Sequence, residues 1–462
     1  MSDTASPTLV RKVVLALRQR DCDLRPALSA AQRILAQEVQ AAGAIQPLLG
    51  REELRDLLEL FLIHGRTMKP ALEAALTRWR ANLLAVADAP AALVTALAVH
   101  CFNNEYVFTE SAAETMLVDP LRGRLNAGEG TVTEAAVFAA YRPLAGEAWA
   151  TRFAESLEVL HRIHIEEPAR EAVLRRSVAR VTPVADAISL DVQRQYEQNP
   201  YPRWQRLDVD RARMPARTGA PGRRVLIAGC GTGKQPLTMA LAAPEDSFWA
   251  LDLSAASLAY AMRKAEEAGV GNITFVQGDI LELAKFDATF DAVVSSGVLH
   301  HLDDPARGLA ALGTALAPGG SLKIEVYTQS VAVDAGIALR REHGLPPTPE
   351  GIRGFRELVC ALPGGHPAAR LTAFEDFHAT SECRDLVFHV KEHRYTLPRL
   401  ADMCATAGFR IARVYAGAAP LARFAARFPD ADPDTDLAAW SALEGEEPEI
   451  LAPMYRVSLA RI

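Results

Sequence analysis

Three glycines in the segment VLIAGCGTGKQ have a spacing that suits ligand binding. Gly229, Gly231 and Gly233 follow an apolar run and precede a helical pattern. Glycine lacks a Cβ and tolerates positive φ, so the backbone can approach a ligand closely at these positions. The start of the following helix would offer free N–H groups. Dinucleotide-binding loops use G-x-G-x-x-G, whereas this loop has G-x-G-x-G, which favours a nucleoside ligand without pyrophosphate.

Acidic residues end the next two predicted strands. Asp252 ends the run FWALDL, where a carboxylate can accept hydrogen bonds from both hydroxyls of a ribose. Asp279 ends the run ITFVQGD, where it can accept an adenine amino group while Ile280 packs on the ring. The alternatives are a helix N-cap for Asp252 and a simple turn for Asp279.

The fourth predicted strand leads into SSGVLHHLDDP, which contains Ser296, Gly297 and His300. In open α/β sheets, ligands bind at the carboxyl ends of the strands, where all these segments would meet. His300 is a candidate general base, because imidazole titrates near neutrality. The alternative is a reaction that needs only alignment of the reactants.

The elements that must position these residues indicate an α/β fold. From residue 224 onward, short β-rich runs alternate with helical stretches, which predicts a parallel sheet covered on both faces. We predict a Rossmann-like sheet of about seven strands over residues 224–462. A helical insertion is expected at 329–395, and residues 420–449 should also contain helices. Residues 1–190 predict an all-helical domain, and residues 191–223 a connector rich in aromatics and proline.

Val225–Thr328 resembles the core of class I S-adenosylmethionine (SAM)-dependent methyltransferases. The resemblance implies that SAM is the cofactor and that the glycine loop contacts its methionine part. It also implies that the Asp252 region binds ribose, the GDI segment binds adenine, and the segment through VLHH lines the site near the sulfonium. Ile227 stands where this family usually has an acid, and Gln235 is a candidate to compensate. The implied cofactor-binding residues are Gly229, Cys230, Gly231, Gly233, Gln235, Asp252, Leu253, Gly278, Asp279, Ile280, Ser296 and Gly297, with Tyr196 added below.

Three further segments resemble a bacterial group of class I methyltransferases with helical N-terminal regions. They are CFNNEYVF, QYEQNPYPRW and CRDLVFHVKEHRYTLPRL. Tyr196 in the second segment could cover the sulfonium, because a ring face attracts a cation; the alternative is a rigid linker.

In the third segment, FHVKEHR predicts a hydrogen-bonded cluster or a pocket wall, and no paired motif supports a metal site. Asn103–Glu105 predicts a buried polar network between domains, or else an interaction site.

Composition narrows the classes of function. The formal net charge is −7, from 50 basic and 57 acidic residues, which does not favour binding to nucleic acid. We find no signal peptide and no run of about 18 apolar residues, so we expect a cytoplasmic protein without membrane spans. The six cysteines are scattered without a C-x-x-C pair, which predicts reduced thiols and no structural metal.

Together, these patterns predict a SAM-dependent methyltransferase that acts on an unidentified acceptor, which could be a small molecule, a peptide or a protein. The helical domain could supply protein contacts. Two alternatives stay open: a SAM-binding regulatory or assembly module without turnover, and an NAD-dependent oxidoreductase. The glycine spacing and the GDI segment argue against the second.

Overall fold

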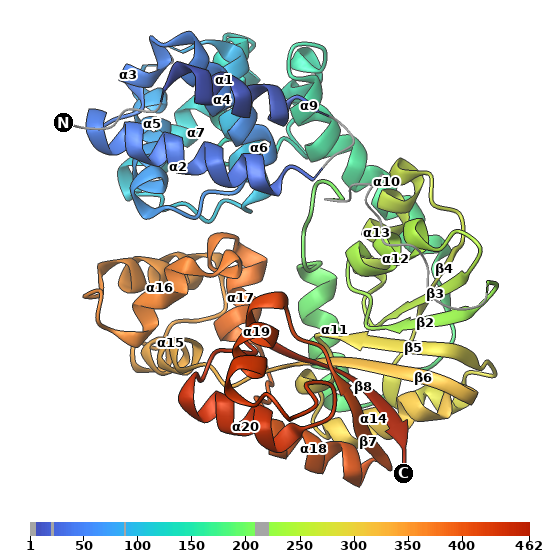
Figure 1. The fold of residues 1–462 in the computed structure, drawn as a ribbon. Helices are drawn as coiled ribbons and strands as arrows, with labels where there is room; N and C mark the ends of the chain where they lie inside the picture. The colour runs from blue at the N-terminus through green and yellow to red at the C-terminus, as the bar shows by residue number, and fades with distance from the viewer. Residues whose placement is uncertain (1–5, 20–22, 87–88, 208–220) are drawn as a thin grey trace. The chain divides into compact units, whose positions relative to one another are not determined.

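The computed structural model describes residues 6–19, 23–86, 89–207 and 221–462 (Figure 1). The chain divides into two compact units, and each draws on separate stretches of sequence. The helical unit comprises Met1–Arg170, Arg203–Met214 and Ala332–Phe388. The sheet unit comprises Glu171–Pro202, Pro215–Val331 and His389–Ile462. Part of the predicted connector, residues 208–220, lies outside the described residues, as does Cys22.

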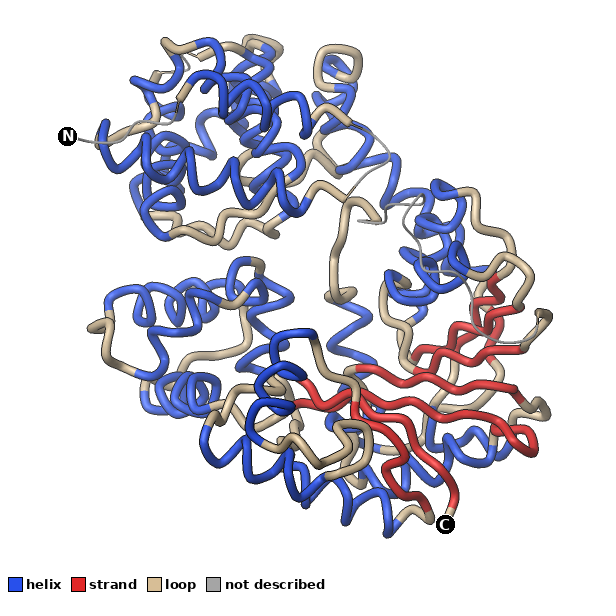
Figure 2. Tube along the Cα trace, viewed as in Figure 1, coloured by secondary structure: helices blue, strands red, loops and turns tan. Residues whose placement is uncertain are grey.

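The sheet unit is built on one eight-stranded sheet in the order β1-β4-β3-β2-β5-β6-β8-β7 (Figure 2). Neighbouring strands from β1 to β6 are parallel, while β8 runs antiparallel to both β6 and β7. The strands are β1 (Ala179–Arg180), β2 (Arg224–Ala228), β3 (Ser247–Asp252), β4 (Ile273–Gln277), β5 (Phe290–Ser296), β6 (Leu316–Tyr327), β7 (Phe409–Val414) and β8 (Met454–Arg461).

Alternate residues of the central strands pack on opposite faces of the sheet. Val225 and Ile227 of β2 join an apolar cluster with α12 and α13, whereas Leu226 and Ala228 join a second cluster with α14 and α18. Burial of both faces is typical of parallel sheets. The helices of this unit are α11 (Ala187–Gln198), α12 (Lys234–Ala242), α13 (Ala255–Ala268), α14 (Pro305–Thr314), α18 (Leu397–Thr406), α19 (Ala418–Arg427) and α20 (Leu437–Glu446), with short turns η4 (Ile280–Lys285) and η5 (Leu299–His301).

The predicted fold class is confirmed, with one strand more than expected. The additional strand, β1, has only two residues and pairs with β4 at the edge of the sheet. It lies within the segment predicted to be entirely helical. It was not predicted, because two residues are too few to show a periodic pattern. The expected helices within residues 420–449 are present as α19 and α20.

The helical unit shares one apolar core between the N-terminal helices and the insertion. Phe61 and Leu76 belong to the same buried cluster as Phe355 and Phe377 from the insertion. The insertion was predicted to belong to the methyltransferase domain, whereas Ala332–Phe388 groups with the N-terminal helices in the structure. The helices are α1 (Pro7–Leu17), α2 (Arg25–Ala42), α3 (Gln46–Leu49), α4 (Glu52–His64), α5 (Pro70–Ala85), α6 (Ala91–Asn103), α7 (Ala112–Asn126), α8 (Val132–Ala139), η1 (Ala148–Phe153), α9 (Glu158–His161) and η2 (Arg162–Glu166), then α15 (Val331–Glu342), α16 (Pro349–Ala361), η6 (Pro367–Ala373), η7 (Glu375–His378) and α17 (Thr380–Phe388); α10 (Glu167–Ser177) spans the boundary between the units.

Arg356, on α16, links the insertion to the N-terminal helices. Its side chain is 3% exposed and donates to both carboxylate oxygens of Glu73 on α5, at 2.8 and 2.9 Å. It also donates to the carbonyl oxygens of Val107 and Phe377. Although burial opposes ionisation, Arg356 and His378 hold the pKa of Glu73 at about 2. Five donors in a fixed fork suit this role, which a lysine could not reproduce.

The motif CFNNEYVF makes a second connection within the helical unit. Glu105 and Tyr106 both have φ of 56°, a region that residues other than glycine rarely adopt. This turn lets the Glu105 carboxylate accept from the Ser381 N–H and its carbonyl oxygen accept from the Thr380 hydroxyl, at the start of α17. Glu105 therefore joins the turn after α6 to the insertion within the helical unit. Asn104, predicted to share a polar network between domains, makes no side-chain hydrogen bond among the described residues.

The described cysteines, Cys101, Cys230, Cys360, Cys383 and Cys404, are free thiols. Among the described helices, none combines the length and apolarity needed to cross a membrane.

Arg356→Ala should destabilise the protein by about 3–5 kcal/mol, because it leaves the buried Glu73 carboxylate without its cation. Denaturant unfolding followed by circular dichroism measures this change. The matched control is Arg18→Ala, since Arg18 is 56% exposed and pairs with Asp56 at the surface. An unfolding midpoint for Arg356→Ala equal to that of the control would show that the insertion does not depend on this contact.

Candidate functional site

The glycine loop joins β2 to α12 and fits tightly between two other segments. Gly229, Gly231 and Gly233 have φ of 79°, 52° and 84°. A Cβ at Gly229 would lie 2.2 Å from Val298 Cγ2, and one at Gly231 would lie 2.7 Å from the Tyr201 carbonyl oxygen. Both the conformation and the lack of space therefore require glycine.

The Asp252 carboxylate, at the end of β3, holds this loop in place. Its Oδ2 accepts from the Gly231 N–H at 2.8 Å, and its Oδ1 accepts from the Ser254 N–H at 2.9 Å. The side chain is only 9% exposed, and burial raises its pKa to about 6 despite these hydrogen bonds. Each carboxylate oxygen still has one further lone pair for a ligand hydroxyl.

The GDI segment lies beside Asp252 at the end of β4. The Gly278 N–H donates to the Asp252 carbonyl oxygen, and the Asp279 N–H donates to the Thr182 hydroxyl at 2.7 Å. Asp279 Oδ1 accepts from the Leu281 N–H, and the Ser189 side chain also interacts with this carboxylate. Burial raises the pKa of this carboxyl group. A carboxylate at this position can accept a hydrogen bond from an amino group of a ligand.

The end of β5 brings Ser296 and Gly297 to the same edge. Gln235, at the start of α12, donates to the Ser296 hydroxyl at 2.9 Å. Ile227 is fully buried in the sheet core and contributes nothing to this edge. Ile280 is buried and belongs to an apolar core cluster of the sheet unit. Burial raises the pKa of the Cys230 thiol.

The aromatic segment predicted as a lid or linker packs directly on the glycine loop. The Thr232 N–H donates to the Tyr201 carbonyl oxygen at 3.3 Å, and its hydroxyl donates to the Pro202 carbonyl oxygen. The preceding helix α11 also reaches β3, because Gln193 donates to the Leu253 carbonyl oxygen. Thr182, Gln193 and Thr232 were not predicted from the sequence, because their contacts join segments far apart in sequence.

The two histidines after β5 make different contacts. His300 is fully buried, its Nδ1 accepts from the Tyr327 N–H at 3.3 Å, and its Nε2 has no partner among the described residues. His301 Nδ1 lies 3.1 Å from the Lys391 carbonyl oxygen, to which it can only donate. Burial lowers the pKa of both imidazoles, and the neighbouring histidines and Arg394 lower it further.

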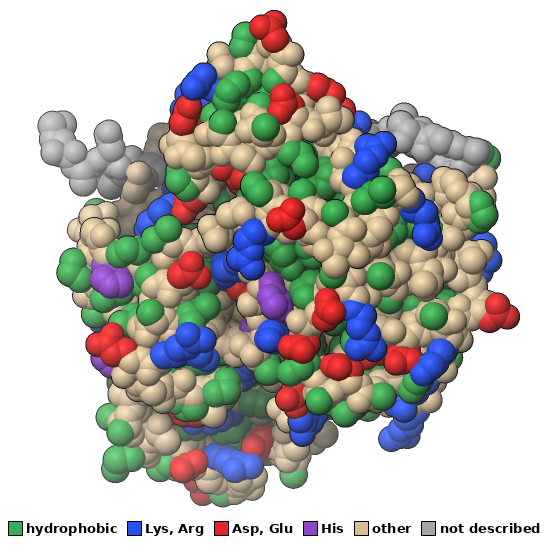
Figure 3. Space-filling view, turned by 90° about the horizontal axis from the view of Figure 1, so that it is seen from below, with side chains coloured by type: hydrophobic (Ala, Val, Ile, Leu, Met, Phe, Trp, Pro, Cys, Tyr) green, Lys and Arg blue, Asp and Glu red, His purple; other side chains and the backbone are tan. Residues whose placement is uncertain are grey.

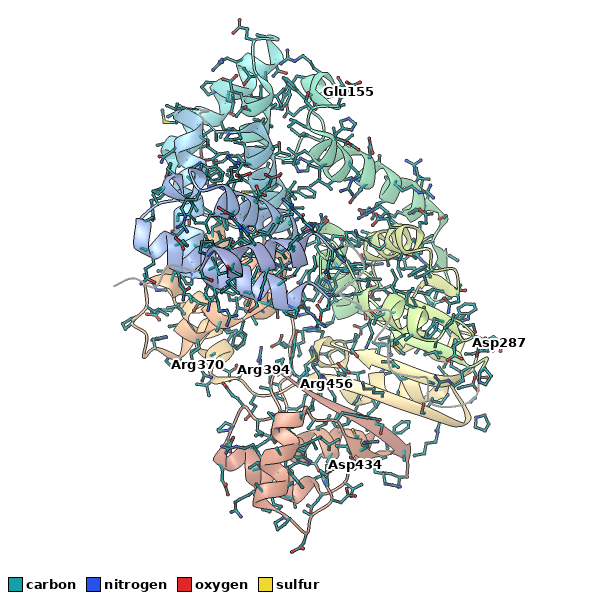
Figure 4. The ribbon with its side chains drawn as sticks, turned by 45° about the horizontal axis from the view of Figure 1, so that its top comes forward. Glu155, Asp287, Arg370, Arg394, Asp434 and Arg456 are labelled. Atoms are coloured by element: carbon teal, nitrogen blue, oxygen red, sulfur yellow. The ribbon has the colours of Figure 1, made fainter. Side chains whose placement is uncertain are left out.

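The FHVKEHR segment forms the hydrogen-bonded cluster that was predicted. The His393 N–H donates to the His300 carbonyl oxygen, and its Nε2 donates to that of Leu302. Arg394, which is labelled in Figure 4, pairs with Glu392, and its guanidinium lies 5.6 Å from the centre of the Tyr327 ring. Sequence segments about ninety residues apart thus meet at one end of the sheet.

Comparison with known proteins assigns the class. Residues 225–320 match the family described as "Methyltransferase domain". The chain is 32% identical over 164 residues to an uncharacterized methyltransferase of Mycobacterium tuberculosis, a match that covers 32% of this chain and 81% of that protein. The chain belongs to the class I SAM-dependent methyltransferases.

Two other relatives share less of their length with this methyltransferase. It is 37% identical over 153 residues to an uncharacterized protein of Synechococcus, covering 32% of this chain and 37% of that protein. It is 41% identical over 106 residues to a trans-aconitate 2-methyltransferase of Deinococcus radiodurans, covering 23% of this chain and 38% of that protein. The chain therefore spans well under half of either relative.

The residues of this methyltransferase fit SAM, the cofactor of its class. The glycine loop lies at the carboxyl end of β2 and is tied to Asp252. The Asp279 carboxylate can accept a hydrogen bond from an adenine amino group. Asp252 keeps lone pairs for ribose hydroxyls while it fixes the loop.

The affinity for SAM should depend on pH through Asp252. Ribose hydroxyls bound at Asp252 would stabilise the ionised carboxylate, so binding should favour that form and lower its pKa below about 6. The affinity should be constant above pH 7 and should fall by up to about tenfold as the pH drops to 5. Isothermal titration calorimetry across this range measures the change.

Asp252→Asn is the control, because it stays neutral at every pH. Its affinity for SAM should be weaker and independent of pH, since the amide nitrogen cannot accept from Gly231 or Ser254. Equal pH profiles for the two proteins would place the ribose elsewhere.

Proposed function

We propose that the sheet unit binds SAM along the carboxyl edge of its strands and transfers the methyl group to an acceptor. The acceptor is a small molecule, a peptide or a protein with an O, N, S or C nucleophile. Bound SAM supplies a methyl group on a sulfonium, which is a strong leaving group. The residues proposed to hold it are those at the ends of β2, β3, β4 and β5, with Tyr196 on α11.

The order of the chemical groups along this edge is the observation that carries the proposal. The sheet order β4-β3-β2-β5 places Asp279, Asp252, the glycine loop and Ser296 in succession. SAM presents an adenine, a ribose and a methionine chain in that same order. Adjacent strands lie about 4.8 Å apart, so four strand ends form an extended row rather than a compact cluster. A row of this kind suits an adenosine extended by an amino acid.

The hydrogen bonds of His300 and His301 suggest separate roles. Because His300 Nδ1 accepts the Tyr327 N–H, the hydrogen of its neutral ring is on Nε2, which can donate to a substrate. Because His301 Nδ1 donates to the Lys391 carbonyl oxygen, its Nε2 keeps a lone pair. His300 would therefore orient or polarise the acceptor, and His301 is the better candidate to take a proton from it.

We assign the choice of acceptor to the helical unit with its insertion. The insertion follows β6 directly, and its two ends are pinned together because Thr328 pairs with Tyr395. Segments that leave the carboxyl ends of strands commonly carry specificity. On the face drawn in Figure 3, basic and acidic side chains are interspersed, which does not favour nucleic acid as the acceptor.

Calorimetry should detect binding of SAM and of its product S-adenosylhomocysteine, with dissociation constants in the micromolar range, about −8 kcal/mol. NAD should not bind, because the glycine loop has the spacing G-x-G-x-G and not the G-x-G-x-x-G of dinucleotide-binding sites. Incubation with methyl-labelled SAM and a cell extract should label an acceptor, and Asp252→Asn should reduce that labelling. Binding of NAD without SAM would contradict the proposal, whereas SAM binding without any labelling would favour a regulatory module.

A further inference from the structure

Two arginines of the insertion have no carboxylate partner among the described residues. Arg384, on α17, is 7% exposed, and its Nη1 is buried without a hydrogen-bond partner there. Arg340, on α15, is half-buried, and its Nε is likewise buried without a partner. Arg80, Arg263 and Arg356, the other buried arginines of the described chain, each pair with a glutamate. A buried cation without an anion is costly, so these two arginines suggest that a ligand supplies the missing charge.

The two arginines line one face of α17. Residues three and seven apart on a helix share a face, so Ser381, Arg384 and Phe388 follow one another along α17. The Ser381 hydroxyl is buried and has no hydrogen-bond partner among the residues that the structure describes. The Arg340 guanidinium lies 5.2 Å from the centre of the Phe388 ring, at the far end of this face. We call Ser381, Arg384 and Arg340 the donor line.

An exposed loop between α15 and α16 contacts both arginines. The Arg384 Nε donates to the Pro347 carbonyl oxygen at 3.2 Å, and the Leu345 N–H donates to the Arg340 carbonyl oxygen at 3.1 Å. Pro347 is exposed, so Arg384 lies next to a surface segment although its own side chain is buried. A ligand can therefore approach Arg384 from the side of this loop, without crossing the apolar core of the helical unit.

The acidic residues around Arg384 are engaged by other groups. Glu105 interacts electrostatically with Arg384, but its carboxylate accepts from the Ser381 N–H. Asp385, the next residue of α17, interacts with Asp376. The carboxylates of the helical unit thus leave the free donors of Arg384 and Ser381 without an acceptor.

The charge of the donor line is not compensated locally. Burial lowers the pKa of Arg384, although Glu105 opposes this change. Burial also lowers the pKa of Arg340, and the neighbouring Arg341 lowers it further. Both guanidinium groups remain protonated at pH 7, because the pKa of arginine starts above 12. The donor line therefore combines two cations and a hydroxyl, which complements an oxyanion.

We infer that the donor line binds a carboxylate or phosphate group, and that this group belongs to the methyl acceptor. The inference rests on the proposed function. A guanidinium N–H and a hydroxyl that lack protein partners match two oxygens of one such group. α17 continues without a linker into the FHVKEHR segment, whose His393 N–H donates to the His300 carbonyl oxygen. One stretch of chain thus carries both the proposed anion site and a contact of the candidate histidine.

Thermal unfolding of the full-length protein tests the anion site without any need for turnover. Inorganic phosphate and malonate are each compared with chloride at the same ionic strength. At about 20 mM of a bound anion, the wild type should unfold about 2–4 °C higher than in chloride. Arg384→Met keeps an unbranched apolar side chain but removes the charge, so it should lose most of this rise. Its unfolding temperature in chloride should be no lower than that of the wild type, because an unpaired buried cation is gone.

Two further variants separate binding from general effects of the salts. Phosphate stabilises many proteins because it is excluded from their surfaces, and that effect is the same in every variant. Arg353→Met is the matched control, since Arg353 belongs to the same insertion but pairs with Glu350 and donates to the Tyr106 carbonyl oxygen. It should keep the full rise, whereas Ser381→Ala should lose part of it.

Methyl labelling in a cell extract tests whether the anionic group belongs to the acceptor. Arg384→Met should bind SAM within about twofold of the wild type but label the acceptor about tenfold less, because a charge-assisted hydrogen bond is lost. Unchanged labelling in Arg384→Met would overturn the assignment to the acceptor.

Equal temperature rises in the wild type, Arg384→Met and Arg353→Met would overturn the anion site itself. A wild type that binds no SAM would contradict the proposed function, and the assignment to the acceptor would fail with it. The unfolding experiment uses neither SAM nor an acceptor, so it would still decide whether the donor line binds an anion.

Discussion

Two backbone N–H groups, from Gly231 and Ser254, donate to the two oxygens of the buried Asp252 carboxylate. One belongs to the loop after β2 and the other to the turn after β3, so a single side chain fixes two strand ends relative to each other. Burial, together with the nearby Glu197 carboxylate, raises the pKa of this carboxyl group to about 6. The ionised form of this buried carboxylate is therefore energetically unfavourable. Hydrogen bonds from ribose hydroxyls would stabilise it.

The remaining features of the edge depend on this arrangement. With Gly231 held by Asp252, the loop has room for Tyr201 and Pro202 above it but none for a Cβ. Tyr201 in turn begins a row of neighbouring rings that ends at Tyr327. The proposed cofactor edge and this row of rings are therefore connected by the contacts of Tyr201.

The helical unit combines the N-terminal helices with the insertion in one core. It takes 57 residues from the middle of the methyltransferase sequence, Ala332–Phe388, into a core formed by the N-terminal helices. Arg356 and Glu105 both make polar contacts between the two parts. Arg356 binds the buried Glu73 carboxylate, and Glu105 binds Ser381 from a turn in which Glu105 and Tyr106 have left-handed backbone conformations. The N-terminal helices cannot be removed without exposing apolar surface of the insertion, such as Phe355 and Phe377.

Sequence patterns predicted the sheet and the polar residues at its edge, because these are local signals. Glycine spacing, acids at strand ends and the alternation of strands and helices all lie within short windows. The shared core of the insertion was missed, since an amphipathic helix does not reveal which surface it packs against. The contacts of Thr232 with Tyr201 and of His301 with Lys391 join segments about 30 and 90 residues apart, and no local pattern encodes them. The tautomers of the histidines follow only from such contacts.

The central claim is that SAM lies across the ends of β4, β3, β2 and β5. A crystal structure of the full-length protein with S-adenosylhomocysteine tests it most directly. The account predicts the adenine amino group within hydrogen-bond distance of Asp279 Oδ2 and the ribose hydroxyls on the Asp252 carboxylate. A ligand bound elsewhere, or bound at this edge with its adenine and amino-acid ends reversed, would contradict it.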